Sequence, residues 1–296
     1  MKFKEGKNMR KIYRNNKFYD SENDVFIDSA TGEAELAQHV IAPESAKIKV
    51  LSDDQLTAYQ QKQQKRSKEA FYFVNTEVDL SNIAGANLTR LIFLNSYRNF
   101  NNDFLMLTER KKMTTDDLPQ LLKISKKSVD RLLAEISPKY LEINADKTIS
   151  LNSEMFFKGR IHKREWARVF SNGIRELYNS CYDNAKAIGY IFEMLPYINY
   201  QYNLLCWNPS ETDPNKIKKM TITEFCDNIG YGRKNYKKLI AQYNDIVFNV
   251  DGTRQKFCSY SNDGINIKDS HVLVNPNVVF SGNNKEDIRI FGNFNV

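Results

Sequence analysis

Two short runs of the sequence gather basic side chains beside amides, hydroxyls or glycine. The first run consists of Ser125, Lys126, Lys127, Ser128 and Arg131. The second run consists of Gly232, Arg233, Lys234, Asn235, Lys237 and Lys238. Lysine and arginine neutralise phosphates, arginine and lysine also bond to guanine, and asparagine can pair with adenine through two hydrogen bonds. Both runs therefore predict contacts with nucleic acid.

Residues 220–240 around the second run predict a helix, a glycine turn and a second helix. Thr221 or Thr223 can cap the first helix, and Glu224 then lies in its first turn, where the helix dipole favours an acid. Gly230-Tyr231-Gly232 supplies positions where a positive φ angle costs little. The second helix buries its apolar residues and leaves the basic run outside. This layout is typical of a helix-turn-helix that places its second helix in a DNA major groove.

The same pattern occurs earlier in the chain, at residues 113–133. This segment aligns with 220–240 without a gap, so that the apolar positions and the basic pairs coincide. Strand candidates follow both segments, and each is closed by the pattern Asn-x4-Phe-x-Gly, at 152–159 and 275–282. Agreement of several blocks in the same order predicts an internal repeat.

A helix, a helix-turn-helix and a short β-hairpin together make a winged helix. We therefore expect a mainly α fold with small β wings (α+β), built as two tandem winged helix-turn-helix domains from internal duplication, plus an N-terminal β/α appendage. The expected division is an N-terminal basic arm, short β-hairpin and polar connector helix at 1–79, a first winged-helix domain at 80–159, a basic inter-domain helix at 160–183, and a second winged-helix domain with a C-terminal tail at 184–296.

The predicted inter-domain helix has two different faces. Its apolar face is expected to contain Trp166, Phe170, Ile174 and Leu177. Its basic face contains the candidate phosphate contacts Arg160, Lys163 and Arg164. One interpretation places this basic face on the DNA backbone between two major-groove contacts, and the alternative is a solvated connector packed by its aromatic residues.

Composition sets further limits. The 296 residues carry a net charge of +7 and a pI of about 9.0, which fits a polyanion partner without requiring one. The four cysteines and three histidines show no zinc-ligand spacing, so the cysteines are expected to be reduced and to serve as small apolar residues. No apolar run approaches the ~20 residues of a membrane span, and we expect a cytoplasmic protein of a bacterial host.

Motifs for catalysis are missing from the sequence. The chain has neither GxxxxGK[ST] nor GxGxxG, and it has no HxH or HExxH metal pattern. We therefore predict no catalytic residues, no metal site and no cofactor. A Ser/His/Asp set assembles from distant positions, so that alternative stays open.

The two helix-turn-helix patterns, the NLLCWNP stretch at 203–209 and the Asn-x4-Phe-x-Gly motif resemble the two-domain replication initiators of theta-type plasmids and their phage relatives. The resemblance covers about 80–285. It implies that both second helices enter successive major grooves of a repeated site, and that dimer and monomer forms differ in role. The residues that would face the two grooves are Ser125, Lys126, Lys127, Ser128 and Arg131 for one, and Gly232, Arg233, Lys234, Asn235 and Lys238 for the next.

The leading hypothesis is thus a sequence-specific double-stranded DNA-binding protein of a phage or plasmid. Replication initiation and transcriptional regulation both remain open, because winged-helix regulators share the same module. Partner candidates besides DNA are a second copy of the chain and the replication or transcription machinery. The alternative is a protein-interaction adaptor without specific DNA binding, which the acidic stretch at 20–54 would suit. An enzyme acting on DNA is a third reading that lacks a recognisable nucleophile or metal site.

Overall fold

The computed structural model describes residues 70–99, 102–152, 154–157, 166–261, 266–282, 285, 288 and 292–296, together with the backbone of four strands nearer the N-terminus. The chain forms two compact units, Met1–Lys68 and Glu69–Val296. In the first unit an antiparallel sheet has the order β1 (Tyr13–Arg14), β2 (Lys17–Asp20), β3 (Val25–Asp28) and β4 (Ala34–Leu36). The short β-hairpin expected in this region corresponds to β2 and β3, which pair antiparallel. The predicted basic arm and connector helix lie largely outside the described residues.

A three-stranded antiparallel sheet begins the second unit. Its central strand β5 (Phe71–Asn75) lies between β8 (Phe156–Phe157) and β9 (Trp166–Phe170). The register pairs Phe71 with Phe170 and Asn75 with Trp166. Alternate residues of β5 are buried, as expected for a strand with one face on the core.

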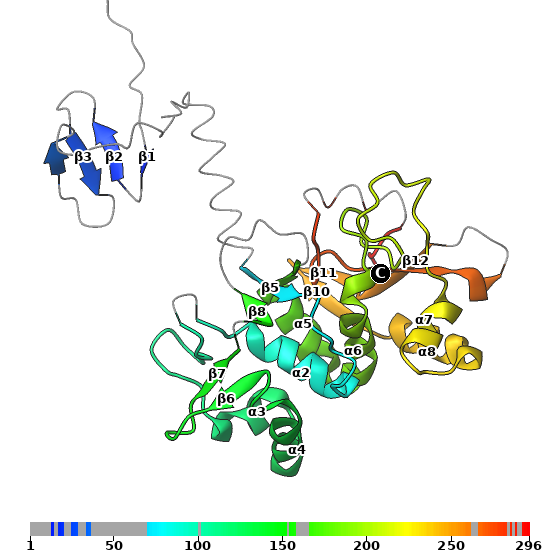
Figure 1. The fold of residues 1–296 in the computed structure, drawn as a ribbon, viewed down its shortest axis with the longest axis horizontal. Helices are drawn as coiled ribbons and strands as arrows, with labels where there is room; N and C mark the ends of the chain where they lie inside the picture. Colours follow the sequence, from blue (N-terminus) through cyan, green and yellow to red (C-terminus); the bar gives the residue numbers. More distant parts are fainter. Residues whose placement is uncertain are drawn as a thin grey trace, which may run out of the picture. The chain divides into compact units, whose positions relative to one another are not determined.

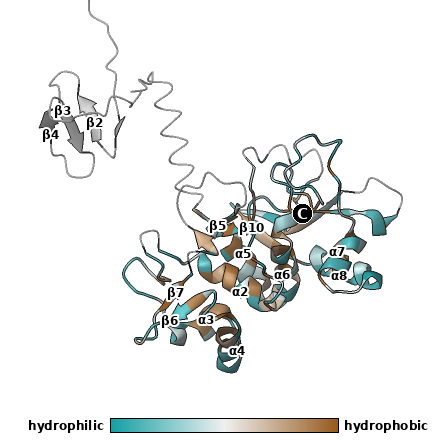
Figure 2. Cartoon of the chain, viewed as in Figure 1, coloured by the Kyte–Doolittle hydropathy of each residue, from teal (hydrophilic) through white to brown (hydrophobic). Residues whose placement is uncertain are grey.

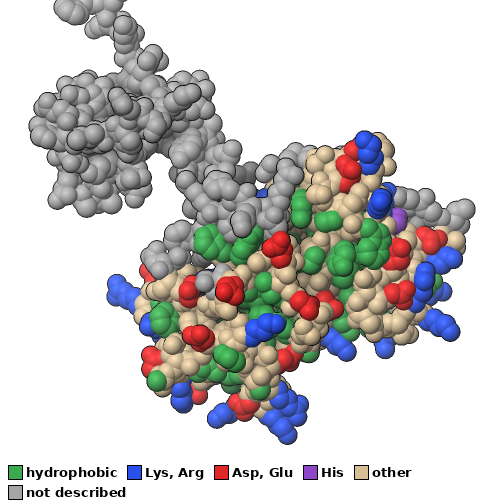
Figure 3. All heavy atoms as spheres, in the orientation of Figure 1, with side chains coloured by type: hydrophobic (Ala, Val, Ile, Leu, Met, Phe, Trp, Pro, Cys, Tyr) green, Lys and Arg blue, Asp and Glu red, His purple; other side chains and the backbone are tan. Residues whose placement is uncertain are grey.

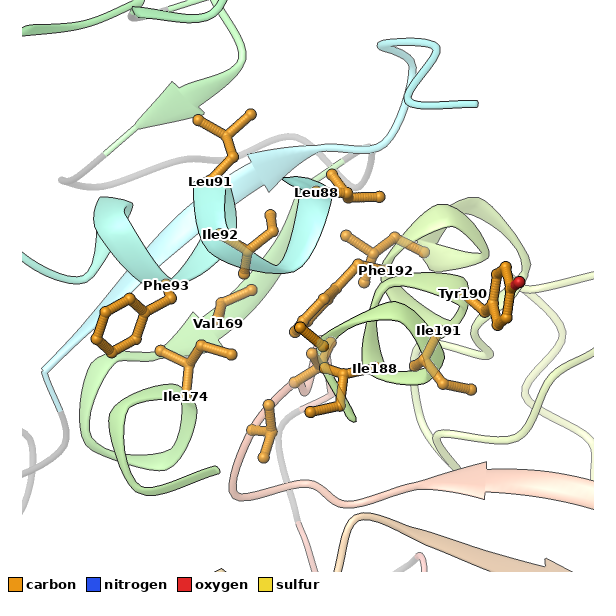
Figure 4. Packing of buried hydrophobic residues seen from close by; sticks show 14 of the residues in the cluster. Leu88, Leu91, Ile92, Phe93, Val169, Ile174, Ile188, Tyr190, Ile191 and Phe192 are labelled. Carbon is orange, nitrogen blue, oxygen red and sulfur yellow. The ribbon is translucent and has the colours of Figure 1, made fainter. Parts of the chain in front are cut away.

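Three helices form the centre of this unit: α2 (Gly85–Asn95), α5 (Ser171–Cys181) and α6 (Ala185–Glu193). Figure 4 shows side chains of α2, β9, α5 and α6 meeting in one apolar core. Phe93 of α2 stacks on Tyr178 of α5, with ring centroids 4.2 Å apart. In Figure 2 these helices are largely apolar in colour, whereas α8 is mostly hydrophilic on the side shown.

The closest approach of the central helices is the crossing of α2 and α6. A Cβ atom built on Gly189 would lie 1.8 Å from the carbonyl oxygen of Gly85, so only glycine fits there. Near the crossing, the buried Thr89 hydroxyl donates a hydrogen bond of 2.7 Å to the carbonyl of Ala185. The two backbones therefore touch, and the side chains on either side interlock around them.

Two helical hairpins with associated strands flank the central helices, one on each side (Figure 1). The first contains a 3-10 turn (Thr115–Asp117), α3 (Leu118–Leu122), α4 (Lys126–Ile136), β6 (Leu141–Ile143) and β7 (Ile149–Leu151). The second contains α7 (Ile222–Asn228), a 3-10 turn (Arg233–Asn235), α8 (Tyr236–Asn244), β10 (Val247–Val250), β11 (Thr253–Lys256), β12 (Cys258–Ser261) and β13 (His271–Val274).

The predicted fold class, a mainly α protein made of two tandem winged helix-turn-helix domains from internal duplication, is wrong. The chain is an α+β mixture with small antiparallel sheets, and within the described residues no internal duplication is shown. Helix α2, from the first predicted domain, packs extensively on α6, from the second. The first hairpin is followed by one two-stranded sheet, whereas the second is followed by two, β10-β11 and β12-β13.

The predicted helix over 160–183 also needs correction. Residues Trp166–Phe170 form strand β9, and the helix α5 begins only at Ser171. The short segment 166–170 is rich in aromatic and β-branched residues, and its pattern fits the period of a helix as well as that of a strand. It forms a strand because it pairs with the edge of β5. Ile174 and Leu177 are buried, as the predicted helical face requires.

Two other expectations can be compared with the structure. The cysteines, predicted to be reduced and apolar in role, are all free and buried: Cys181, Cys206, Cys226 and Cys258. None of the helices in the described ranges has the length and apolar character needed to cross a membrane.

Because Gly189 touches the Gly85 backbone, the variant Gly189→Ala should lose at least about 1–3 kcal/mol of unfolding free energy, the usual cost of overpacking a core. Urea unfolding followed by circular dichroism measures this loss. Gly292→Ala is the matched control, because its new Cβ would meet only side-chain atoms, the Ser259 hydroxyl oxygen at 3.2 Å and the Leu273 Cδ2 at 3.5 Å being the nearest. Equal losses in both variants would show that the crossing is not a tight constraint.

Candidate nucleic-acid interface

The second helical hairpin begins with a capping box. The Thr221 hydroxyl accepts a hydrogen bond of 3.2 Å from the Glu224 backbone N–H. In return the Glu224 carboxylate accepts 2.7 Å bonds from the backbone N–H and the hydroxyl of Thr221. Of the two caps that the sequence allowed, the structure uses Thr221, which fixes the start of α7.

The glycine turn is formed as predicted, with φ angles of +62° at Gly230 and +82° at Gly232. After it, Arg233, Lys234 and Asn235 form a single 3-10 turn that leads into α8. The Asn235 side-chain amide donates a bond of 3.2 Å back to the Tyr231 carbonyl. The basic run is therefore held at the N-terminal end of α8, where backbone N–H groups and the helix dipole favour an anion.

We define the second basic surface as Arg233, Lys234, Lys237 and Lys238, all of which are exposed. The opposite side of α8 is anchored in the core. Leu239 and Tyr243 are fully buried, and the Tyr243 hydroxyl donates a 2.8 Å bond to the Ala187 carbonyl in α6. The second surface is thus fixed to a central helix.

The first hairpin presents a comparable set. Ser125 is the N-cap of α4, and its hydroxyl accepts a 3.2 Å bond from the Ser128 N–H. We define the first basic surface as Lys126, Lys127 and Arg131, which are exposed on α4. Ser128 is half-buried, and its hydroxyl lies 3.0 Å from that of Ser125. The two serines therefore order the helix start as well as being candidate contacts.

The first hairpin is also tied to the centre. The Tyr178 hydroxyl of α5 donates a 2.8 Å bond to the Leu122 carbonyl at the end of α3. The turn between α3 and α4 has Lys123 with a φ of +53°, an unusual conformation for a residue with a side chain. Its Nζ donates a 2.9 Å bond to the Asn179 carbonyl and lies 4.8 Å from the Tyr182 ring centroid. These contacts hold the turn in place.

Acidic side chains close to each basic surface modify its charge. On α4, Asp130 is exposed beside the first basic surface, and Glu135 accepts hydrogen bonds from Ala84 and Asn87 at the start of α2. Beside the second surface, the Asp227 carboxylate lies 3.5 Å from the Arg233 guanidinium. Figure 3 shows lysine and arginine side chains over α4 and around α7 and α8, with acidic side chains between them.

The structure therefore brings the predicted residues together in two clusters, one per hairpin, on either side of α2, α5 and α6. It does not merge them into a single patch. Arg160, Lys163 and Arg164 lie outside the described residues. Sequence reasoning missed the Asp227–Arg233 pair, although an acid shortly before a glycine turn and a base just after it are the available signal.

Hydrogen bonding fixes the charge state of the capping acid Glu224. Partial burial acts to raise its pKa, but the bonds from the Thr221 backbone and hydroxyl, with the nearby Arg233, lower the pKa below its ordinary value. The Asp117 carboxylate in the first hairpin has a lowered pKa for a similar reason, because the bonds from Thr114 and Lys111 outweigh its burial. Both acids are therefore ionised at neutral pH.

Within the described ranges, no three His, Cys, Asp or Glu side chains gather as a metal site requires. Comparison with protein-family models, with curated protein sequences and with solved structures gave no significant match.

The lowered pKa of Glu224 predicts a pH-dependent contribution to stability. The ionised acid stabilises the fold above its unfolded pKa of about 4.3, and this contribution is lost as the pH falls through the lower folded pKa. We expect Glu224→Gln to lose about 0.3–1 kcal/mol at pH 7 and to differ little from the parent chain at pH 3. Urea unfolding across this range measures the difference.

Glu176→Gln, on an exposed position of α5, removes the same charge and is the matched control. If its difference from the parent chain follows pH as that of Glu224→Gln does, net charge rather than the capping box causes the effect.

Proposed function

We propose that this protein binds double-stranded DNA through the first and second basic surfaces, with sequence preference. The observation that supports this proposal most directly is local. In each helical hairpin the second helix begins with exposed basic residues, while its other side is buried against the core. An exposed helix start of this kind can enter a major groove, and its cations can bond to phosphates or to guanine.

Both basic surfaces are attached to the same helical core. Tyr178 links the first hairpin to α5, and Tyr243 links the second hairpin to α6. Because α5 and α6 belong to one packed core, the two surfaces cannot separate freely. A duplex with two half-sites at a fixed spacing suits such an arrangement better than two independent sites.

The resemblance to theta-type replication initiators favours replication initiation as the role of this DNA binding, and transcriptional regulation is the alternative. Direct repeats in the preferred DNA would support a replication initiator, because equivalent contacts would recur along one strand direction. A palindrome would support a dimeric transcriptional regulator, because operator symmetry mirrors protein symmetry. Selection of bound sequences from random DNA distinguishes the two.

Removal of either basic surface should weaken DNA binding. We expect Lys126→Ala/Lys127→Ala and Arg233→Ala/Lys234→Ala each to reduce affinity, and each lost phosphate contact should flatten the slope of log K against log salt by about 0.9. Changes in base preference, about 1–3 kcal/mol per lost base contact, should accompany loss of a base-reading residue. Fluorescence anisotropy over a salt series, on the selected DNA, measures both quantities.

Lys216→Ala/Lys218→Ala is the charge-matched control, because both lysines are exposed in the loop that precedes the second hairpin. It should leave the slope unchanged. Binding that survives both surface variants would reject this assignment of the DNA-binding residues, and an absence of salt-dependent binding by the parent chain would reject the function itself.

A further inference from the structure

An acid beside the second basic surface has no role in the proposed contacts. Asp227 is near the end of α7, and its carboxylate lies 3.5 Å from Nη1 of Arg233 across the glycine turn. The side chains are 46% and 65% exposed, respectively. Solvent therefore screens the pair, which contributes little to folding. The pair lies across the turn that leads into α8, beside the second basic surface, which points instead to an effect on binding.

A second carboxylate acts on the same arginine. Glu224, one turn earlier on α7, is fixed by its two bonds to Thr221, and Arg233 is one of the charges that act on it. Arg233 therefore forms an ion pair with one acid of the preceding helix, and its charge also acts on a second acid, Glu224. When Arg233 leaves this position for DNA, it gives up a favourable contact and uncovers Asp227 near the phosphates.

The first hairpin lacks this arrangement. Gln120, which is neutral, aligns with Asp227, and Asp117 forms its ion pair with Lys111 at 3.1 Å. Among the described residues, no ion pair involves Lys126, Lys127 or Arg131. The cations of the first basic surface can thus contact phosphates without first breaking an ion pair. In the second basic surface, Arg233 must first leave Asp227.

We infer that Asp227 is a specificity-determining residue, which withholds Arg233 from DNA that does not offer it a strong base contact. This inference rests on the proposed function. On unrelated DNA, Arg233 would exchange a carboxylate for a phosphate, with little net gain. On a site with a suitably placed guanine, two hydrogen bonds to O6 and N7 compensate for the lost carboxylate. A repulsive element of this kind lowers affinity for wrong sequences more than for the right one.

The variant Asp227→Asn tests this idea, since it keeps the side-chain size and removes the charge. We expect its affinity for an unrelated duplex to rise by about two- to fivefold, the range of an exposed ion pair. Its salt slope on that duplex should steepen by about one unit, as for one added phosphate contact. Affinity for the selected site should rise less, so the ratio of specific to non-specific affinity falls.

Asp130→Asn is the matched control, because it removes an exposed acid from the first DNA-facing helix without freeing an arginine. It should leave the affinity ratio unchanged. In an Arg233→Gln background, Asp227→Asn should also leave the ratio unchanged. Anisotropy titrations on the selected duplex and on a shuffled duplex of the same length give all the ratios, and unfolding midpoints confirm that each variant is folded.

Two results would overturn the inference while the proposed function stands: an equal change of the ratio in Asp227→Asn and Asp130→Asn, or an effect of Asp227→Asn that persists without Arg233. A parent chain that binds neither duplex would overturn the inference together with the proposed function. The two failures are therefore distinguishable.

Discussion

The contact between the backbones of α2 and α6 is the constraint on which the rest of the second unit depends. Gly189 has no room for a side chain against Gly85, and the Thr89–Ala185 hydrogen bond lies beside this contact. Close-packed helices leave little freedom for sliding, because interlocked side chains tolerate only small shifts. Elements attached to these helices therefore inherit a fixed geometry.

Both helical hairpins are attached to this core by a buried tyrosine that donates to a backbone carbonyl. Tyr178 reaches Leu122 at the end of α3, and Tyr243 reaches from α8 to Ala187. A buried hydroxyl left without its partner would carry a desolvation cost, so these bonds favour one docked position for each hairpin. The exposed basic residues of α4 and α8 thus lie on helices whose opposite faces are buried in the core.

The two hairpins reach similar helix starts by different local chemistry. In the second, Gly230 and Gly232 take positive φ angles without steric cost. In the first, Lys123 takes such an angle, and its side chain contacts Asn179 and Tyr182. The second basic surface also contains an arginine held by a nearby acid, so similar sequence patterns give surfaces with different electrostatic properties.

Local patterns in the sequence determined part of the secondary structure: the Thr221 cap region, the glycine turn and the buried face that contains Ile174 and Leu177. These predictions succeeded because capping, turn conformation and helical periodicity depend on neighbours in the chain. The prediction of a helix at 166–170 was wrong because the pattern of these residues fits a helix or a strand. Pairing with β5, which is distant in the sequence, selected the strand.

The exposed positions of the basic residues followed from helical periodicity, so the sequence by itself determined which residues form the candidate interface. Only the tertiary structure decided the fold class, because the sequence does not show that α2 packs on α6 across the expected domain boundary. It also decided which cations have acidic neighbours, since the Asp227–Arg233 distance depends on how the glycine turn folds. Local secondary structure depends on residues that are neighbours in the sequence. Helix packing and ion pairing depend on residues that only folding brings together.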